Sequence, residues 1–109
     1  MLKEARWSIR LPLEIDIKMQ ISPAIHLNAR TRDVSFEGML VAISLPRTTR
    51  NTPVLVHFDC HRKPVIAAAV VMRTGPEETA LMFTGENEEV ADALALLMQS
   101  ELDRLLVAV

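Results

Sequence analysis

The chain has few of the residues that build disulfide scaffolds, glycine-rich loops and aromatic binding faces. Its 109 residues include one cysteine, three glycines, one tryptophan and no tyrosine. The lone Cys60 excludes an internal disulfide and favours a reducing, cytoplasmic setting. The N-terminus lacks the apolar stretch of a signal peptide. The longest dense apolar run, Val65–Met72, is shorter than the roughly 20 residues of a membrane-spanning helix, so we expect no membrane insertion.

Charge of neither sign dominates the chain as a whole. The net charge is −2, which argues against broad binding of nucleic acids. The two halves differ, however: residues 1–50 carry 8 basic and 5 acidic side chains, and residues 51–109 carry 4 and 9. A phosphate-binding site is therefore expected in the first half. Half of the residues are apolar, which is enough to form the core of one domain spanning residues 1–109.

Apolar residues alternate with polar ones in much of the chain. Residues 11–21 have an apolar side chain at every odd position, which predicts a strand with one buried face. The stretch 28–44 is also extended, and Gly38 within it suggests a bulge or a close backbone approach. Later strands are predicted at 54–59, 65–73 and 79–84. Five or six strands of this kind indicate a mainly β protein, a small antiparallel barrel over residues 11–84.

The last segment, residues 87–107, has a helical pattern instead. Asn87 is a good N-cap, and Glu88 and Glu89 suit the first turn of a helix. Apolar residues recur at spacings of three and four. They are Val90, Leu94, Leu97, Met98, Leu102, Leu105 and Leu106. We expect this face to pack on the barrel as core, and secondarily to contact a partner or a second copy, so that the protein is a monomer or a homodimer.

The N-terminal arm, residues 1–10, contains an R-x-x-x-R motif formed by Arg6 and Arg10. A guanidinium group binds phosphate oxygens or the N7 and O6 atoms of guanine, and it stacks on purine faces. Four extended residues reach about 13–14 Å, enough to contact different parts of a dinucleotide. Trp7, between them, stacks on a ligand or packs the arm on the barrel. The alternative is a solvated arm with no ligand.

A second motif, D-x-S-x-x-G, begins at Asp33. Asp33 can accept hydrogen bonds from guanine N–H groups, and Ser35 can donate or accept. If both lie on one strand they point to the same face. Gly38 would let a ligand approach closely, and Arg32 could add a phosphate contact. The alternative is a turn followed by a strand, with Asp33 and Ser35 bonded to the local backbone.

No other group of residues forms a convincing site. His57, Asp59 and His61 alternate, but a solvated strand end explains them better than a metal site does. Cys60 has no base beside it on the same strand face, so we predict neither a catalytic residue nor an enzyme. A nucleic-acid-binding barrel would need more aromatic residues and a basic groove. We therefore expect no metal, no cofactor and no nucleic-acid partner.

Together, the two motifs and the order of elements resemble the PilZ domain, a bacterial receptor module for cyclic di-GMP. Arg10 is followed by Leu11-Pro12-Leu13 and an alternating strand, and Gly38 leads into the next apolar strand. The resemblance covers essentially all 109 residues. It implies a six-stranded barrel in which cyclic di-GMP is bound by Arg6, Arg10, Asp33, Ser35 and Gly38.

The resemblance also implies a function and shows two departures from the family pattern. A cytoplasmic receptor of this kind orders its arm on binding cyclic di-GMP and signals to an effector protein, which the sequence does not identify. The alternative is an adaptor with the same fold that binds a protein and no nucleotide. Ala5 stands where relatives often have a further arginine, and Glu37 stands where they often have glycine. Glu37 adds negative charge near a dianionic ligand.

Overall fold

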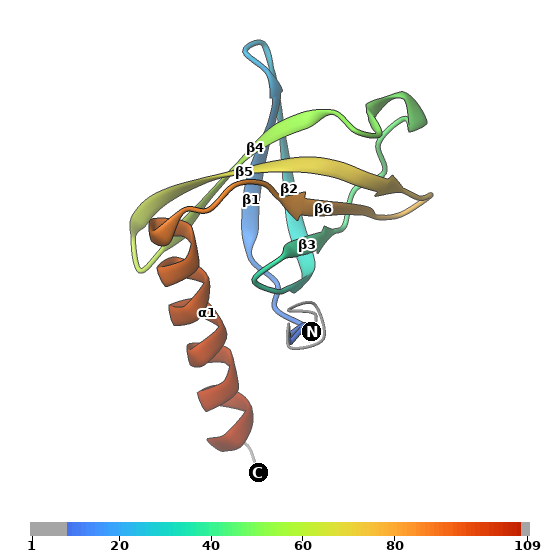
Figure 1. Cartoon of the computed structure of the whole chain (residues 1–109). Coiled ribbons are helices and arrows are strands. Elements are labelled where there is room, and N and C mark those ends of the chain that lie inside the picture. The colour runs from blue at the N-terminus through green and yellow to red at the C-terminus, as the bar shows by residue number, and fades with distance from the viewer. Residues whose placement is uncertain (1–8, 108–109) are drawn as a thin grey trace, which may run out of the picture.

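The computed structural model describes residues 9–107, which form a closed six-stranded antiparallel barrel followed by one α-helix (Figure 1). The predicted fold class is therefore confirmed. The elements are β1 (Asp16–Ser22), β2 (Ile25–Val34), β3 (Gly38–Val41), the short 3-10 helix η2 (Arg47–Thr49), β4 (Pro53–Cys60), β5 (Lys63–Thr74), β6 (Thr79–Phe83) and α1 (Glu88–Val107). Around the barrel the strands lie in the order β1, β2, β3, β6, β5, β4, and β4 pairs with β1 to close it.

The alternation in the sequence places one face of each strand in the barrel interior. In β4, Val54, Val56, Phe58 and Cys60 are buried, while Leu55 between them is exposed. The same rule in the other strands fills the core with branched and flexible apolar side chains. Residues at most 3% exposed in this core include Met19, Met39, Val41, Val56, Val65, Val71 and Leu81.

The stretch 28–44, predicted as one extended run, is two antiparallel strands. β2 ends at Val34 and β3 begins at Gly38, and the two pair with Val34 opposite Met39. The three residues 35–37 form the connecting turn. Gly38 therefore marks the start of a new strand, where the sequence suggested an irregularity within a single one.

Regular pairing of the first strand begins later than residue 11. Leu11 makes an isolated bridge to Val34, and β1 begins only at Asp16. Between them the chain is held by a side chain: the buried Thr31 hydroxyl donates to the Leu13 carbonyl at 2.6 Å and accepts from the Ile15 N–H at 2.9 Å. The Thr31 N–H also donates to the Ile15 carbonyl at 3.0 Å, so Thr31 binds this segment through both its side chain and its backbone.

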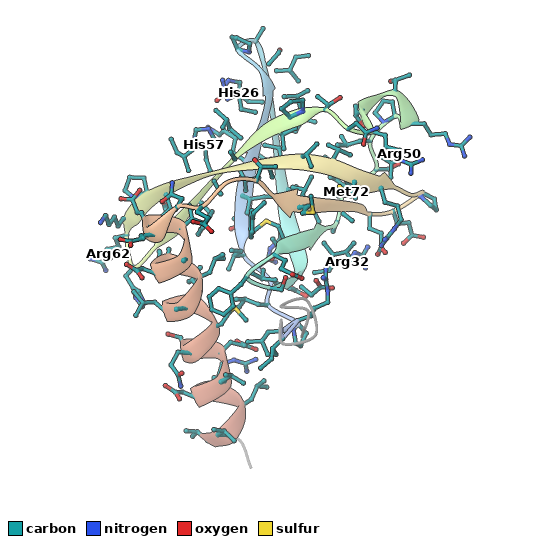
Figure 2. All side chains as sticks on the ribbon, in the orientation of Figure 1. His26, Arg32, Arg50, His57, Arg62 and Met72 are labelled. Carbon is teal, nitrogen blue, oxygen red and sulfur yellow. The ribbon has the colours of Figure 1, made fainter. Side chains whose placement is uncertain are left out.

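The turn of the β4–β5 hairpin contains two residues in the left-handed region of backbone conformation. His61 has a φ of 51° and Arg62 a φ of 70°, and Cys60 pairs with Lys63 across them. Two central residues with positive φ are typical of a type I′ turn, which normally favours asparagine and glycine. Arg62 lies at the tip of this hairpin (Figure 2).

α1 begins at the predicted position. The Asn87 side chain accepts hydrogen bonds from the N–H groups of Glu89 at 2.9 Å and Val90 at 3.2 Å, as an N-cap does. Val90, Ala93 and Leu94 belong to the core cluster, so the first half of α1 packs against the barrel.

The second half of α1 extends away from the barrel (Figure 1). Leu105 is 39% exposed and Leu106 is 70% exposed, so the prediction that they pack as core is wrong. Val90, Leu94 and Met98 are buried as predicted, and Leu97 and Leu102 are partly buried. The apolar stripe is thus longer than the surface that the barrel offers it.

Candidate functional site: a groove beside the end of β2

Two backbone hydrogen bonds fix where the N-terminal segment enters the barrel. The Leu11 N–H donates to the Val34 carbonyl at 3.0 Å, and the Val34 N–H donates to the Leu11 carbonyl at 3.0 Å. This reciprocal pair holds Arg10 next to Asp33. Two residues 23 positions apart in sequence are therefore neighbours because of the fold, not because of local chain geometry.

Arg10 and Asp33 form an ion pair. The Arg10 Nη2 atom lies 2.8 Å from Asp33 Oδ1, and Arg10 Nε donates to the same oxygen at 3.1 Å. The Arg10 side chain is 53% exposed and that of Asp33 is 24% exposed. A pair this exposed contributes at most about 1 kcal/mol to stability. Its consequence is positional, since it holds a guanidinium at the end of β2 and leaves Asp33 Oδ2 without a bond to Arg10.

Ser35 does not share a strand face with Asp33, so that prediction is wrong. β2 has ended, and the Ser35 side chain is fully buried in the turn. Its Oγ accepts hydrogen bonds from the N–H groups of Glu37 at 3.1 Å and Gly38 at 3.2 Å. It also donates to the Gly38 carbonyl at 3.3 Å. The alternative of a turn with local backbone hydrogen bonds therefore describes Ser35.

Gly38 is required by the fold at this point. A Cβ atom added to Gly38 would lie 2.0 Å from the carbonyl oxygen of Leu81 on β6. The predicted close backbone approach is therefore confirmed, and the approaching chain is β6.

A groove of about 720 Å³ lies beside this turn, on the outer face of β3, β6 and β5. Arg10 and Asp33 line it, as do Glu37 and Gly38 from the turn and the following strand. Its apolar lining comes from the three strands and the turn. Those residues include Phe36, Leu40, Met72, Ala80, Met82 and Phe83. Met72 lies on β5 and is 41% exposed (Figure 2). We call this hollow the β3–β6 groove.

A further cation on this groove was given no role by the sequence. Arg73, on β5, lines the β3–β6 groove with Arg10. The neighbouring order of β3, β6 and β5 brings Arg73 there; its position matches one that is often basic in the PilZ pattern, but that match alone gave it no ligand role. Arg32, considered a possible phosphate contact, does not line the groove. Its Nη2 atom lies 3.9 Å from Glu77 Oε1 and its Nε atom lies 3.6 Å from Glu78 Oε1, both in the β5–β6 connection.

A second hollow of about 450 Å³ lies between the barrel and the N-terminal end of α1. Phe36, Phe83 and Gly85 line both this hollow and the β3–β6 groove. The chain has only three phenylalanines, and one of them, Phe36, is 49% exposed and not packed in the core. The turn at residues 35–37 therefore presents an aromatic ring between two concave surfaces.

Arg6, which the resemblance assigns to ligand binding, and Trp7, a possible further contact, lie outside the described residues. Among residues 9–107 no group of three metal-binding side chains is found. His61 lies in the β4–β5 turn, so it does not continue the strand face of His57 and Asp59 as the alternating pattern assumed. Burial raises the pKa of the Cys60 thiol. Within the described part of the chain, no helix has the length and apolar character needed to cross a bilayer.

The fold and groove define a class: a closed antiparallel barrel with a C-terminal helix and an arginine–aspartate pair where the N-terminal segment joins it. Among solved structures, the chain is similar to the PilZ domain of CeSA from a cellulose-synthesizing bacterium, with a TM-score of 0.74 and 24% identity over 86% of this chain and 99% of that one. It is also similar to MotI/DgrA, an inhibitor of motility from Bacillus subtilis, with a TM-score of 0.68 and 18% identity over 96% of this chain and 53% of that one. The chain therefore has the PilZ-domain fold.

Sequence comparisons add no closer relationship. No protein-family model matches the chain, and no curated protein matches it. Both solved structures are less than 25% identical to it, so they show the fold alone.

Proposed function

We propose that the protein is a receptor for cyclic di-GMP and that the β3–β6 groove is its binding site. The observation that carries the proposal is the Arg10–Asp33 pair on the edge of a groove with an apolar lining. Such a groove offers a dinucleotide a cation for phosphate, apolar surface for a base and an acceptor for a base N–H group. The similarity to a PilZ domain supports the same proposal at the level of the fold.

The five residues that the resemblance assigns to the ligand each have a role in this proposal. Arg6 and Arg10 hold phosphate and guanine through charge-assisted hydrogen bonds. Asp33 Oδ2 accepts from a guanine N–H group, since both Arg10 contacts use Oδ1. Ser35 and Gly38 act by holding the turn that forms one end of the groove. None of these groups does chemistry on the ligand, so the protein acts as a receptor and not as an enzyme.

Signalling in this proposal passes to an effector protein in the bacterial cytoplasm. Ligand binding orders the N-terminal arm against the groove and changes a surface that the effector recognises. The exposed end of α1 is a second candidate for contact with a partner or another copy, because Leu106 and Val107 are each more than half exposed. That surface also keeps open the alternative of an adaptor that binds protein and no nucleotide.

The test is a calorimetric titration of the protein with cyclic di-GMP, with GTP and the linear dinucleotide as controls. Arg10→Ala should weaken binding at least about tenfold, because a hydrogen bond to a charged group contributes about 1.5–3 kcal/mol. Its fold should be retained, since the Arg10–Asp33 pair is exposed.

Arg50→Ala is the matched control. It removes the same charge from an exposed residue that does not line the groove. If Arg10→Ala binds as tightly as the parent, or if both variants lose affinity equally, the assignment of the site is wrong. A folded parent that binds no nucleotide would remove the receptor proposal and favour the adaptor.

A further inference from the structure

The turn between β2 and β3 presents two side chains toward solvent whose chemistry suits a guanine base. Phe36 and Glu37 are both exposed, and both line the β3–β6 groove. Phe36 supplies an aromatic face, on which a base can stack. Glu37 supplies a carboxylate, whose two oxygens match the adjacent N1–H and N2–H donors on the Watson–Crick edge of guanine.

The backbone of this turn is held from both sides. The Glu37 N–H donates to Ser35 Oγ at 3.1 Å, and the Glu37 carbonyl accepts from the Phe83 N–H of β6 at 2.8 Å. The neighbouring Gly38 N–H also donates to Ser35 Oγ. Because the backbone is fixed, the two exposed side chains leave it in defined directions, and little ordering of the main chain is needed when a ligand binds.

The two carboxylates on the groove differ in what they have left to offer. Asp33 Oδ1 receives both contacts from Arg10, so only Oδ2 remains for a base. Glu37 forms no ion pair with any residue between 9 and 107. A base edge with two adjacent donors is therefore better matched by Glu37 than by Asp33.

We propose that Phe36 and Glu37 form a guanine-binding subsite, in which the base stacks on the phenylalanine ring and Glu37 accepts from N1–H and N2–H. This inference rests on the proposed cyclic di-GMP function and deepens it. In this subsite the negative charge of Glu37 helps to select the base. Without such a role, the charge would only repel a dianionic ligand. Adenine has no matching pair of donors, and hypoxanthine has the N1–H but lacks the amino group.

The experiment compares three ligands on the parent and on Glu37→Gln. The ligands are cyclic di-GMP, cyclic di-AMP and the inosine analogue of cyclic di-GMP, whose bases lack the exocyclic amino group. The parent should prefer guanine over hypoxanthine. Glu37→Gln should reduce that preference about tenfold, because a site built to accept a hydrogen bond discriminates against ligands lacking the donor.

Two matched controls separate this effect from charge and from folding. Glu86→Gln removes the same charge from an exposed residue that lines the other hollow but not the β3–β6 groove, and it should keep the preference of the parent. Phe36→Ala should weaken binding about tenfold through lost stacking, while Leu106→Ala, on the exposed end of α1, should not. Circular dichroism confirms the fold of each variant.

The outcomes are distinct. If Glu37→Gln binds more tightly than the parent, or retains the full guanine preference, Glu37 does not read the base and the inference is overturned. If the parent itself binds none of the three ligands, the proposed function fails and the inference falls with it, and this is seen before any variant is measured.

Discussion

Replacing Gly38 by alanine should destabilise the barrel severely, and the structure allows the size of the effect to be worked out. The new Cβ atom would lie 2.0 Å from the Leu81 carbonyl oxygen, whereas ordinary contacts of this kind are 3.4–4 Å. β3 and β6 would have to move apart by more than 1 Å. The atom that obstructs is backbone oxygen in a paired strand, so no side-chain rotation can relieve the clash.

The cost has two parts. Overpacking a tightly fitted site costs about 1–3 kcal/mol. Separating the strands also stretches hydrogen bonds such as that from the Phe83 N–H to the Glu37 carbonyl, at about 1 kcal/mol each. The free energy of unfolding should therefore fall by about 3–5 kcal/mol. This is a large share of the total for a typical domain, which is about 5–15 kcal/mol. In urea the unfolding midpoint should fall by about 2 M.

The other two glycines are controls for this measurement. Gly75→Ala meets only the Glu78 carbonyl oxygen at 3.4 Å and should change stability little. Gly85 has a φ of +74° with nothing within 4 Å, so its alanine variant should lose about 1 kcal/mol through backbone strain alone. If Gly38→Ala unfolds within about 1 kcal/mol of Gly75→Ala, the close approach of β6 is not present in solution. The same argument means that lost ligand binding in Gly38→Ala would not show a ligand contact at this residue.

Three further predictions test the turns and the helix. Ser35→Ala leaves the N–H groups of the turn without their acceptor and should lower the free energy of unfolding by about 1–3 kcal/mol, measured in urea; an unchanged midpoint would contradict its structural role. Replacing His61-Arg62 by Asn-Gly should stabilise the protein by about 1 kcal/mol, because both residues have positive φ; a lower melting temperature would refute this. Hydrogen bonding to Arg104 lowers the pKa of Glu101 below its ordinary value of 4.5. The ionised Glu101 therefore contributes to stability above pH 4.5, and this contribution is lost as the pH falls through the lower pKa of the folded state. Arg104→Gln should therefore flatten the acid side of a plot of melting temperature against pH, and an unchanged slope would argue against the pair.

The strands were predictable because successive side chains of a strand point to opposite faces of the sheet, so a strand with one buried face alternates apolar and polar residues. In β4 the period-two alternation corresponds to buried and exposed residues almost position by position. The turn at residues 35–37 was predicted only as the alternative to a ligand site, because it has no proline, asparagine or glycine at its centre. The buried Ser35 hydroxyl stabilises this turn by accepting hydrogen bonds from two backbone N–H groups, and serine is a weaker turn signal in a sequence than proline, asparagine or glycine.

The helix shows a different limit of sequence analysis. The spacing of its apolar residues correctly predicted a helix with one apolar face, and Asn87 correctly marked its start. Periodicity does not report how far the neighbouring surface extends, so Leu105 and Leu106 were assigned to a core that the barrel does not provide. Likewise, Arg73 joins the groove only because β5 lies beside β6, a relation between distant segments that no local pattern contains.

The two interpretations of the D-x-S-x-x-G motif, a ligand site or a local turn, describe the same piece of structure from two sides. Ser35 and Gly38 face inward, and their hydrogen bonds and close packing hold the turn against β6. Phe36 and Glu37, between them, face the groove because the inward pair fixes the backbone there. A site that must place an aromatic ring and a carboxylate precisely needs such a rigid support, since a loose turn would lose affinity to the cost of ordering it. Ser35 and Gly38 are therefore better understood as the support, while Asp33, Phe36 and Glu37 form the surface that would meet the ligand in the proposed site.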